Sequence, residues 1–234
     1  MKNLTDITFI LDRSGSMASM VNDVVGGWKS FIEKQKAEVG ECLVSLVQFD
    51  TEYETPFVAV PIANVSESLN FKPRGGTALR DAIGRTINSV GARFRSLKAD
   101  QRPDKVLIVI MTDGEENSSH EFTQHQIQNM VKHQQDQYQW EFLFLGANID
   151  SFDVGHSLGI APWAITNYSY TSKGMNAGFN TVSVYSSCLR SGKQFIGTLS
   201  QCQAKNEADD GSTPKNAADL TTPILAERPR RMRA

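Results

Sequence analysis

Cysteine is scarce in this chain, and its spacing excludes two kinds of cross-linked fold. The 234 residues include three cysteines, Cys42, Cys188 and Cys202. An odd number at wide spacing gives neither a disulfide framework nor a zinc-binding pattern. We therefore expect free thiols and a reducing, cytoplasmic compartment.

Long apolar runs are also missing. The longest, Val106–Met111, is far shorter than a stretch that spans a bilayer. The apolar stretch near the N-terminus, Ile7–Leu11, is too short for the core of a secretory signal. The formal net charge is -2, so the composition does not call for nucleic acid or a membrane surface as a partner. We expect the protein to bind neither.

Several catalytic and nucleotide-binding motifs are absent as well. Lys29 and Ser30 follow Trp28 instead of the glycine that a phosphate-binding Walker A loop requires. No Gly-x-Ser-x-Gly nucleophile motif is present around the serines that follow the first apolar run. His125 and His133 are two helical turns apart, with no cysteine or carboxylate at ligand spacing. A solvated polar helix face is a simpler interpretation of these two residues than a zinc site.

What the chain does contain is an alternation of apolar strands and amphipathic helices. Hydrophobic residues make up 40% and charged residues 21%, which is ordinary for a globular protein. Short apolar runs are typical of strands buried on both faces, and the segments between them have apolar residues at helical spacing. The predicted strands are Ile7–Leu11, Leu43–Phe49, Tyr53–Val60, Val106–Met111, Phe142–Leu145 and Trp163–Tyr168.

This order of elements predicts an α/β fold that is Rossmann-like and doubly wound. The expected sheet is mostly parallel, has about six strands, and carries helices on both faces. Tyr53–Val60 follows a tight turn and contains Pro56, so it is expected to be one antiparallel edge strand. Residues 1–192 are expected to form this domain. Residues 193–234 contain few large apolar side chains and are expected to be a polar, disordered tail with an Arg-rich end.

Oxygen-bearing side chains gather where the predicted strands end. The first strand is followed by an Asp-x-Ser-x-Ser sequence, and the most apolar strand by Thr-Asp-Gly. A Gly-Gly-Thr sequence precedes the helix between them. The carboxyl ends of parallel strands meet at one edge of a sheet, so these segments should lie close together. The residues expected to converge are Asp12, Ser14, Ser16, Thr77 and Asp113.

Two carboxylates and three hydroxyls form an all-oxygen set of ligands. Such hard ligands favour Mg²⁺, with Mn²⁺ as an alternative, over zinc. A dication would neutralise the repulsion between Asp12 and Asp113, and a coordination position facing solvent could accept a partner's carboxylate. For the Asp-x-Ser-x-Ser segment taken alone, a helix-capping turn is the competing interpretation. Glu115 and Glu116 follow Asp113 and are interpreted as a solvated acidic rim.

In order, spacing and context, the five residues resemble the metal-ion-dependent adhesion site of von Willebrand factor type A domains. The resemblance covers roughly residues 5–190 and is strongest to stand-alone intracellular A domains of bacteria and their phages, including the TerY-like group. It implies that Ser14, Ser16 and Thr77 ligate the metal, while Asp12 and Asp113 act directly or through water.

The resemblance also implies a function. It predicts a cytoplasmic, non-enzymatic module that binds a protein partner in the presence of Mg²⁺, through an acidic residue of that partner. Two alternatives stay open. One is an adaptor or substrate-recognition subunit for an AAA+ ATPase. The other is a metal-dependent hydrolase, for which Glu115 or Glu116 is the nearest candidate general base.

Overall fold

Six strands form one sheet in the computed structural model, which describes residues 3–208. Their order is β3-β2-β1-β4-β5-β6, and every neighbouring pair is parallel except β2 and β3, which are antiparallel. The strands are β1 (Thr5–Asp12), β2 (Cys42–Phe49), β3 (Tyr53–Pro61), β4 (Lys105–Thr112), β5 (Glu141–Gly146) and β6 (Ile165–Asn167). The predicted fold, including the antiparallel edge strand, is confirmed.

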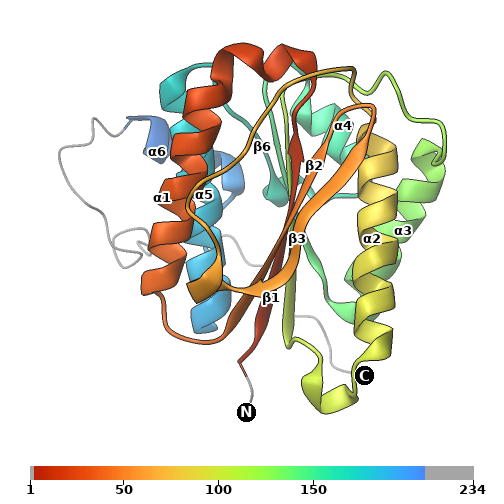
Figure 1. The fold of residues 1–234 in the computed structure, drawn as a ribbon, viewed down its shortest axis with the longest axis vertical. Helices are drawn as coiled ribbons and strands as arrows, with labels where there is room; N and C mark the ends of the chain where they lie inside the picture. The colour runs from red at the N-terminus through yellow and green to blue at the C-terminus, as the bar shows by residue number, and fades with distance from the viewer. Residues whose placement is uncertain (1–2, 209–234) are drawn as a thin grey trace.

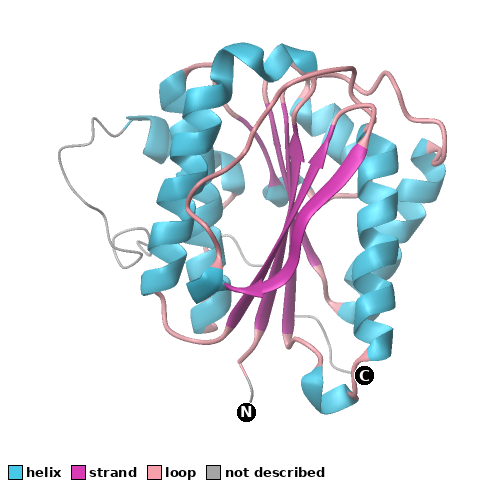
Figure 2. Cartoon of the chain, in the orientation of Figure 1, coloured by secondary structure: helices cyan, strands magenta, loops and turns pink. Residues whose placement is uncertain are grey.

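Helices cover both faces of this sheet (Figures 1 and 2). α1 and α5 lie on one face, and α2 and α3 lie on the other (Figure 1). The helices are α1 (Val21–Ala37), α2 (Leu79–Ser96), α3 (Gln124–Tyr138), α4 (Ser151–Ser157), α5 (Ser172–Ser191) and α6 (Leu199–Ala208). Within the described part of the chain, none of them is long and apolar enough to cross a bilayer.

The two central strands, β1 and β4, determine where the candidate site lies. All residues of β1 are buried, as are all but the first residue of β4, because helices pack on both faces of the sheet. β1 and β4 run in parallel as direct neighbours, with Leu11 opposite Met111. Asp12 and Asp113 therefore lie at the same edge of the sheet, where β1 gives way to a 3-10 helix, Gly15–Met20.

The C-terminal part differs from the sequence-based expectation in two elements. β6 is shorter than the predicted strand because Pro162–Ala164 forms a 3-10 turn that begins on a proline. α6 lies in the segment predicted to be a tail, but it packs against α5 and β6. Its residue Leu199 is fully buried, which supplies the apolar contact that the composition of the segment did not reveal.

The division of the chain at residue 192 stays a prediction. The described residues extend the ordered part of the chain through α6. Residues 209–234, which include the Arg-rich end, lie outside the described residues.

Candidate metal site

The structure brings the five predicted site residues to one edge of the sheet. Asp12 is the last residue of β1, and Asp113 directly follows β4. Ser14 and Ser16 lie at the start of the 3-10 helix, and Thr77 lies two residues before α2. All of them are buried except Ser16, whose exposure marks the side that faces solvent.

Hydrogen bonds join four of these residues into one cluster. The Ser14 and Ser16 hydroxyls are 3.0 Å apart. The Ser16 hydroxyl donates to Asp113 Oδ1 at 2.7 Å. The Ser14 backbone N–H donates to Asp12 Oδ1, also at 2.7 Å, which ties Asp12 to the loop that carries the two serines.

Thr77 joins the same cluster from a glycine loop. Gly75 has a φ of 66°, a left-handed conformation that glycine adopts without steric cost. The Thr77 backbone N–H donates to Asn117 Oδ1 at 2.9 Å, which fixes the end of the loop. A Cβ built on Gly114 would lie 3.3 Å from Thr77 Oγ1 and 3.7 Å from Ser16 Oγ. The two hydroxyls therefore border the same glycine, next to Asp113.

The electrostatics of the two carboxylates favour a bound cation. Burial raises the pKa of Asp12 to about 6, against hydrogen bonds from Thr112 and Ser14, and the charge of Asp113 raises it further. Burial also raises the pKa of Asp113. The Asp113 Oδ2 atom is buried and no donor reaches it with good hydrogen-bond geometry, while nearby Ser16 and Tyr170 hydroxyls lower the pKa of this carboxylate. A buried carboxylate oxygen without a partner costs free energy, and a cation beside it would supply the missing interaction.

The chemistry of the donors fits a hard divalent cation. All five side chains offer oxygen, the ligand atom that Mg²⁺ and Mn²⁺ favour. Across residues 3–208, no group of three or more histidine, cysteine, aspartate or glutamate side chains could hold a metal ion. A metal at this edge would therefore depend on the hydroxyls of Ser14, Ser16 and Thr77 as well as on the carboxylates.

Three residues that support the site were not identified from the sequence. The Thr112 hydroxyl donates to Asp12 Oδ2 at 2.6 Å. The Tyr168 hydroxyl donates to the Thr112 carbonyl oxygen at 3.2 Å. The Tyr170 hydroxyl donates to the Ser16 carbonyl oxygen. Thr112 stands inside the Thr-Asp-Gly sequence and could have been found there, whereas the two tyrosines come from a distant part of the chain.

Glu116 does not belong to a solvated acidic rim. Its side chain is 18% exposed. Its carboxylate accepts hydrogen bonds from the backbone N–H groups of Ser118, Ser119 and Arg80 at 2.9, 2.8 and 2.9 Å, and from the Ser119 hydroxyl. Glu116 therefore caps α2 and is not a free general base. Glu115 is exposed, as expected for a rim residue.

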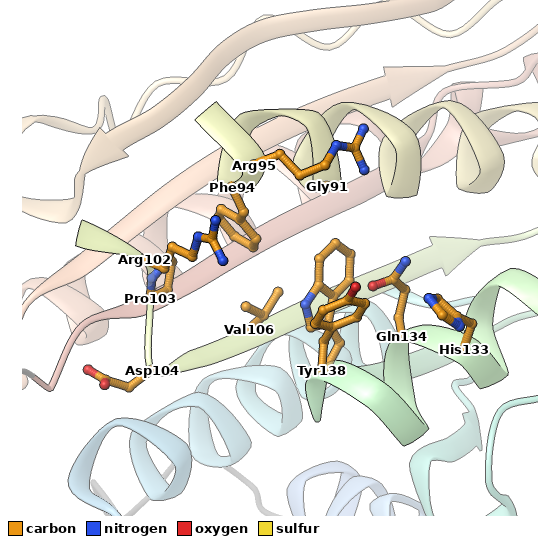
Figure 3. A pocket seen from close by; sticks show the side chains of 11 residues that line it. Gly91, Phe94, Arg95, Arg102, Pro103, Asp104, Val106, His133, Gln134 and Tyr138 are labelled. Carbon is orange, nitrogen blue, oxygen red and sulfur yellow. The ribbon is translucent and has the colours of Figure 1, made fainter. Parts of the chain in front are cut away.

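A separate cavity of about 240 Å³ lies at the other end of β4 (Figure 3). Phe94, Tyr138 and Trp140 line it with aromatic side chains, and Val106, near the start of β4, lines it as well. Asp113 follows the opposite end of this strand. The cavity is therefore distinct from the candidate metal site.

Comparison with known proteins identifies the family. A sequence model of the von Willebrand factor type A domain matches residues 6–158, more than half of the chain. The chain belongs to the von Willebrand factor type A domain family. The family predicted from the sequence is thus confirmed. Among curated proteins, no match to its sequence is found.

Solved structures show the same fold at low sequence identity. Proximal thread matrix protein 1 from the mussel byssus, described with a zinc-occupied MIDAS motif, aligns at 14% identity and a TM-score of 0.55, over 78% of this chain and 46% of that chain. The pilus adhesin SpaC from Lactobacillus rhamnosus GG aligns at 16% identity and a TM-score of 0.59, over 84% and 32%. The von Willebrand factor domain of the pili tip protein Mfa5 from Porphyromonas gingivalis aligns at 11% identity and a TM-score of 0.57, over 83% and 97%.

These structures differ in how much of their own length the A domain spans. This chain covers less than half of the mussel protein and of SpaC, but nearly all of the Mfa5 domain. At such low identity the likeness concerns the fold alone.

Proposed function

We propose that this A domain binds Mg²⁺ on Asp12, Ser14, Ser16, Thr77 and Asp113 and uses the ion to bind a partner protein through a carboxylate. The observation that carries the proposal is the convergence of these oxygens on the buried Asp113 carboxylate, whose Oδ2 atom no donor reaches with good hydrogen-bond geometry. Mn²⁺ fits the same donors. The bound ion would neutralise the negative charges of Asp12 and Asp113.

A binding role suits this site better than catalysis. Two carboxylates balance the charge of a bound dication, but the other three proposed ligands are neutral hydroxyls, which leave the ion Lewis-acidic enough to accept an anionic group. Ser16 marks the solvent side, where such a group would arrive. The Glu116 carboxylate is already occupied by hydrogen bonds, which leaves Glu115 as the nearby carboxylate that a hydrolase would need.

Three expectations from the sequence stay predictions. The role as an adaptor for an AAA+ ATPase rests on family resemblance, and no described contact favours it. Co-purification of the chain with an ATPase would establish that role. The cytoplasmic location and the bacterial or phage origin likewise await a direct test.

Binding of acidic peptides tests the proposed function. A library of peptides that carry aspartate or glutamate is compared with counterparts in which asparagine or glutamine replaces the acid. We expect acidic peptides to bind the wild-type domain in Mg²⁺, and this binding to be lost in EDTA, in the amide counterparts and in Thr77→Ala. Thr55→Ala, which changes an exposed threonine on β3, serves as the matched control and should bind normally. Equal binding in Mg²⁺ and EDTA would contradict the proposal.

A further inference from the structure

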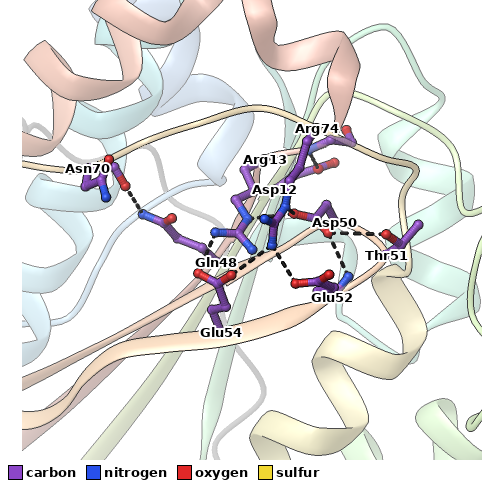
Figure 4. Close-up of polar contacts among 10 residues, drawn as sticks. Asp12, Arg13, Gln48, Asp50, Thr51, Glu52, Glu54, Asn70 and Arg74 are labelled. Carbon is purple, nitrogen blue, oxygen red and sulfur yellow. Dashed lines mark hydrogen bonds and ion pairs between the residues drawn. The ribbon is translucent and has the colours of Figure 1, made fainter.

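Asp50 carries a fully buried carboxylate in the turn between β2 and β3. Arg13 Nε donates to its Oδ2 atom at 2.7 Å, and Arg74 Nε donates to the same atom at 3.0 Å. The Glu52 backbone N–H donates to Oδ1 at 2.7 Å (Figure 4). A charge without access to water needs such partners, and removing one partner is strongly destabilising.

The two arginines belong to the loops that carry the proposed metal ligands. Arg13 stands between Asp12 and Ser14, and Arg74 stands three residues before Thr77. Successive side chains at a strand end point to opposite sides, so Arg13 turns away from the side that Asp12 and Ser14 share. Its side chain is 6% exposed and reaches Asp50 behind the metal loop.

Backbone hydrogen bonds link the same segments. The Arg74 N–H donates to the Arg13 carbonyl oxygen at 2.8 Å, and the Gly15 N–H donates to the Gly75 carbonyl oxygen at 3.1 Å. The Ala78 N–H donates to the Asp50 carbonyl oxygen at 3.0 Å. The two ligand loops are therefore joined to each other, and Asp50 contacts both through its side chain and the Thr77 loop through its backbone as well.

Two outer carboxylates contribute less. Arg74 Nη2 pairs with Glu52 at 2.6 Å and with Glu54 at 2.8 Å, and Arg13 Nη1 pairs with Glu54 at 2.7 Å. The Glu52 and Glu54 side chains are 66% and 46% exposed, so water and salt weaken these pairs. Asp50 is the carboxylate in this network that is shielded from solvent.

We propose that Asp50 is a positioning residue for the metal site, whose carboxylate holds the Ser14–Ser16 loop and the Thr77 loop in register. This inference rests on the metal-binding function proposed above. Without the negative charge of Asp50, the buried Arg13 guanidinium and the half-exposed Arg74 guanidinium lose the carboxylate that lies between them and repel each other. The loops that follow Arg13 and Arg74 then separate, and the oxygens of Ser14, Ser16 and Thr77 no longer converge on one point.

Asp50→Asn tests the inference, because it removes the charge and keeps the size of the side chain. The chain offers a matched control at the other end of β1. Asp6 is also fully buried, and Arg93 Nη1 and Nη2 donate to its carboxylate at 2.8 and 2.9 Å. Asp6→Asn removes the same kind of pair, but it touches neither ligand loop. Arg74→Gln is a milder second variant if Asp50→Asn fails to fold.

The first measurement is amide hydrogen exchange in EDTA. The inference predicts that Asp50→Asn speeds exchange of the Gly15 and Ala78 N–H groups by about 10-fold or more, and that Asp6→Asn leaves them unchanged. This readout needs no metal. Unchanged exchange at both amides in Asp50→Asn and Arg74→Gln would overturn the inference, as would equal acceleration in Asp6→Asn.

The second measurement is titration calorimetry with MgCl₂ and MnCl₂. Residues that orient metal ligands typically change metal affinity by 10- to 100-fold, so Asp50→Asn should weaken binding by about 10-fold or more. Asp6→Asn should bind like the wild type. Wild-type affinity in Asp50→Asn would overturn the inference. If the wild type binds neither ion, the proposed function fails, and the exchange rates still show whether Asp50 holds the two loops together.

Discussion

Asparagine in place of Asp12 should make the metal-free domain more stable than the wild type and should remove stabilisation by Mg²⁺. Asp12 is fully buried, next to the charge of Asp113. Asparagine has nearly the same shape and carries no charge. The Oδ1 atom of the asparagine can accept the hydrogen bond from the Ser14 backbone N–H, and its Nδ2 can donate a hydrogen bond to the Thr112 hydroxyl. That hydroxyl can then donate to the Gly114 carbonyl oxygen, 3.2 Å away.

The pKa of Asp12 sets the size of the effect. Its folded value of about 6 compares with an ordinary value of 3.8. A difference of about 2 units corresponds to about 3 kcal/mol between the charged and neutral forms at pH 7. Asp12→Asn should therefore raise the free energy of unfolding in EDTA by about 1 to 3 kcal/mol.

The same shift fixes the pH dependence. Because the folded pKa is raised, the folded wild type holds its proton more tightly than the unfolded chain does. The contribution of Asp12 to wild-type stability therefore falls as the pH rises from about 4 to about 6, and the advantage of Asp12→Asn develops over that window. Below about pH 4 both states of the wild type are protonated at this position, so the advantage should disappear.

Urea unfolding followed by circular dichroism, with and without Mg²⁺, measures both effects. Mg²⁺ at 100 times its dissociation constant should stabilise the wild type by about 2.7 kcal/mol. It should leave Asp12→Asn unchanged. The reasoning is refuted if Asp12→Asn is less stable than the wild type in EDTA at pH 7, or if Mg²⁺ stabilises both proteins equally.

Two further predictions concern packing. Gly26→Ala should stabilise the domain by about 0.5 to 1 kcal/mol, because no atom lies within 4 Å of the added Cβ on helix α1. Gly27→Ala should destabilise it by about 1 to 3 kcal/mol, because its Cβ would overlap the Phe179 ring on α5; similar thermal midpoints for the two variants would contradict this. Leu199→Ala should cost about 2 to 5 kcal/mol, because α6 buries this side chain fully. Exposed Lys205→Ala is its control, and equal urea midpoints would show that α6 adds no stability.

The sheet and the candidate site were largely predictable for one physical reason. Parallel strands buried on both faces have continuous apolar sequences, and their carboxyl ends meet at one edge. Asp12 and Asp113 each follow such a run, so their proximity follows from the order of the strands. Thr77 was predictable from the two glycines before it, which let a loop approach that edge.

Long-range contacts between polar side chains were not predictable in the same way. Arg13 occupies a variable position of the Asp-x-Ser-x-Ser sequence, and nothing local links it to Asp50. Glu54 lies on the edge strand β3, and nothing in the local sequence links it to Arg13 and Arg74, with which it pairs. Glu116 was taken for a rim residue because its four hydrogen bonds come from a folded loop and the start of α2. Such partners depend on tertiary packing, which the hydrophobic periodicity of the sequence does not reveal.

Titration of the EDTA-treated, dialysed domain with MgCl₂ tests the central claim most directly. We predict saturable heat at one site per chain for the wild type, and none for Asp113→Ala or Thr77→Ala, with circular dichroism spectra that show all three proteins folded. MnCl₂ should give the same pattern. A wild type that binds neither ion, or variants that bind with wild-type affinity, would contradict the assignment of these residues to a metal site.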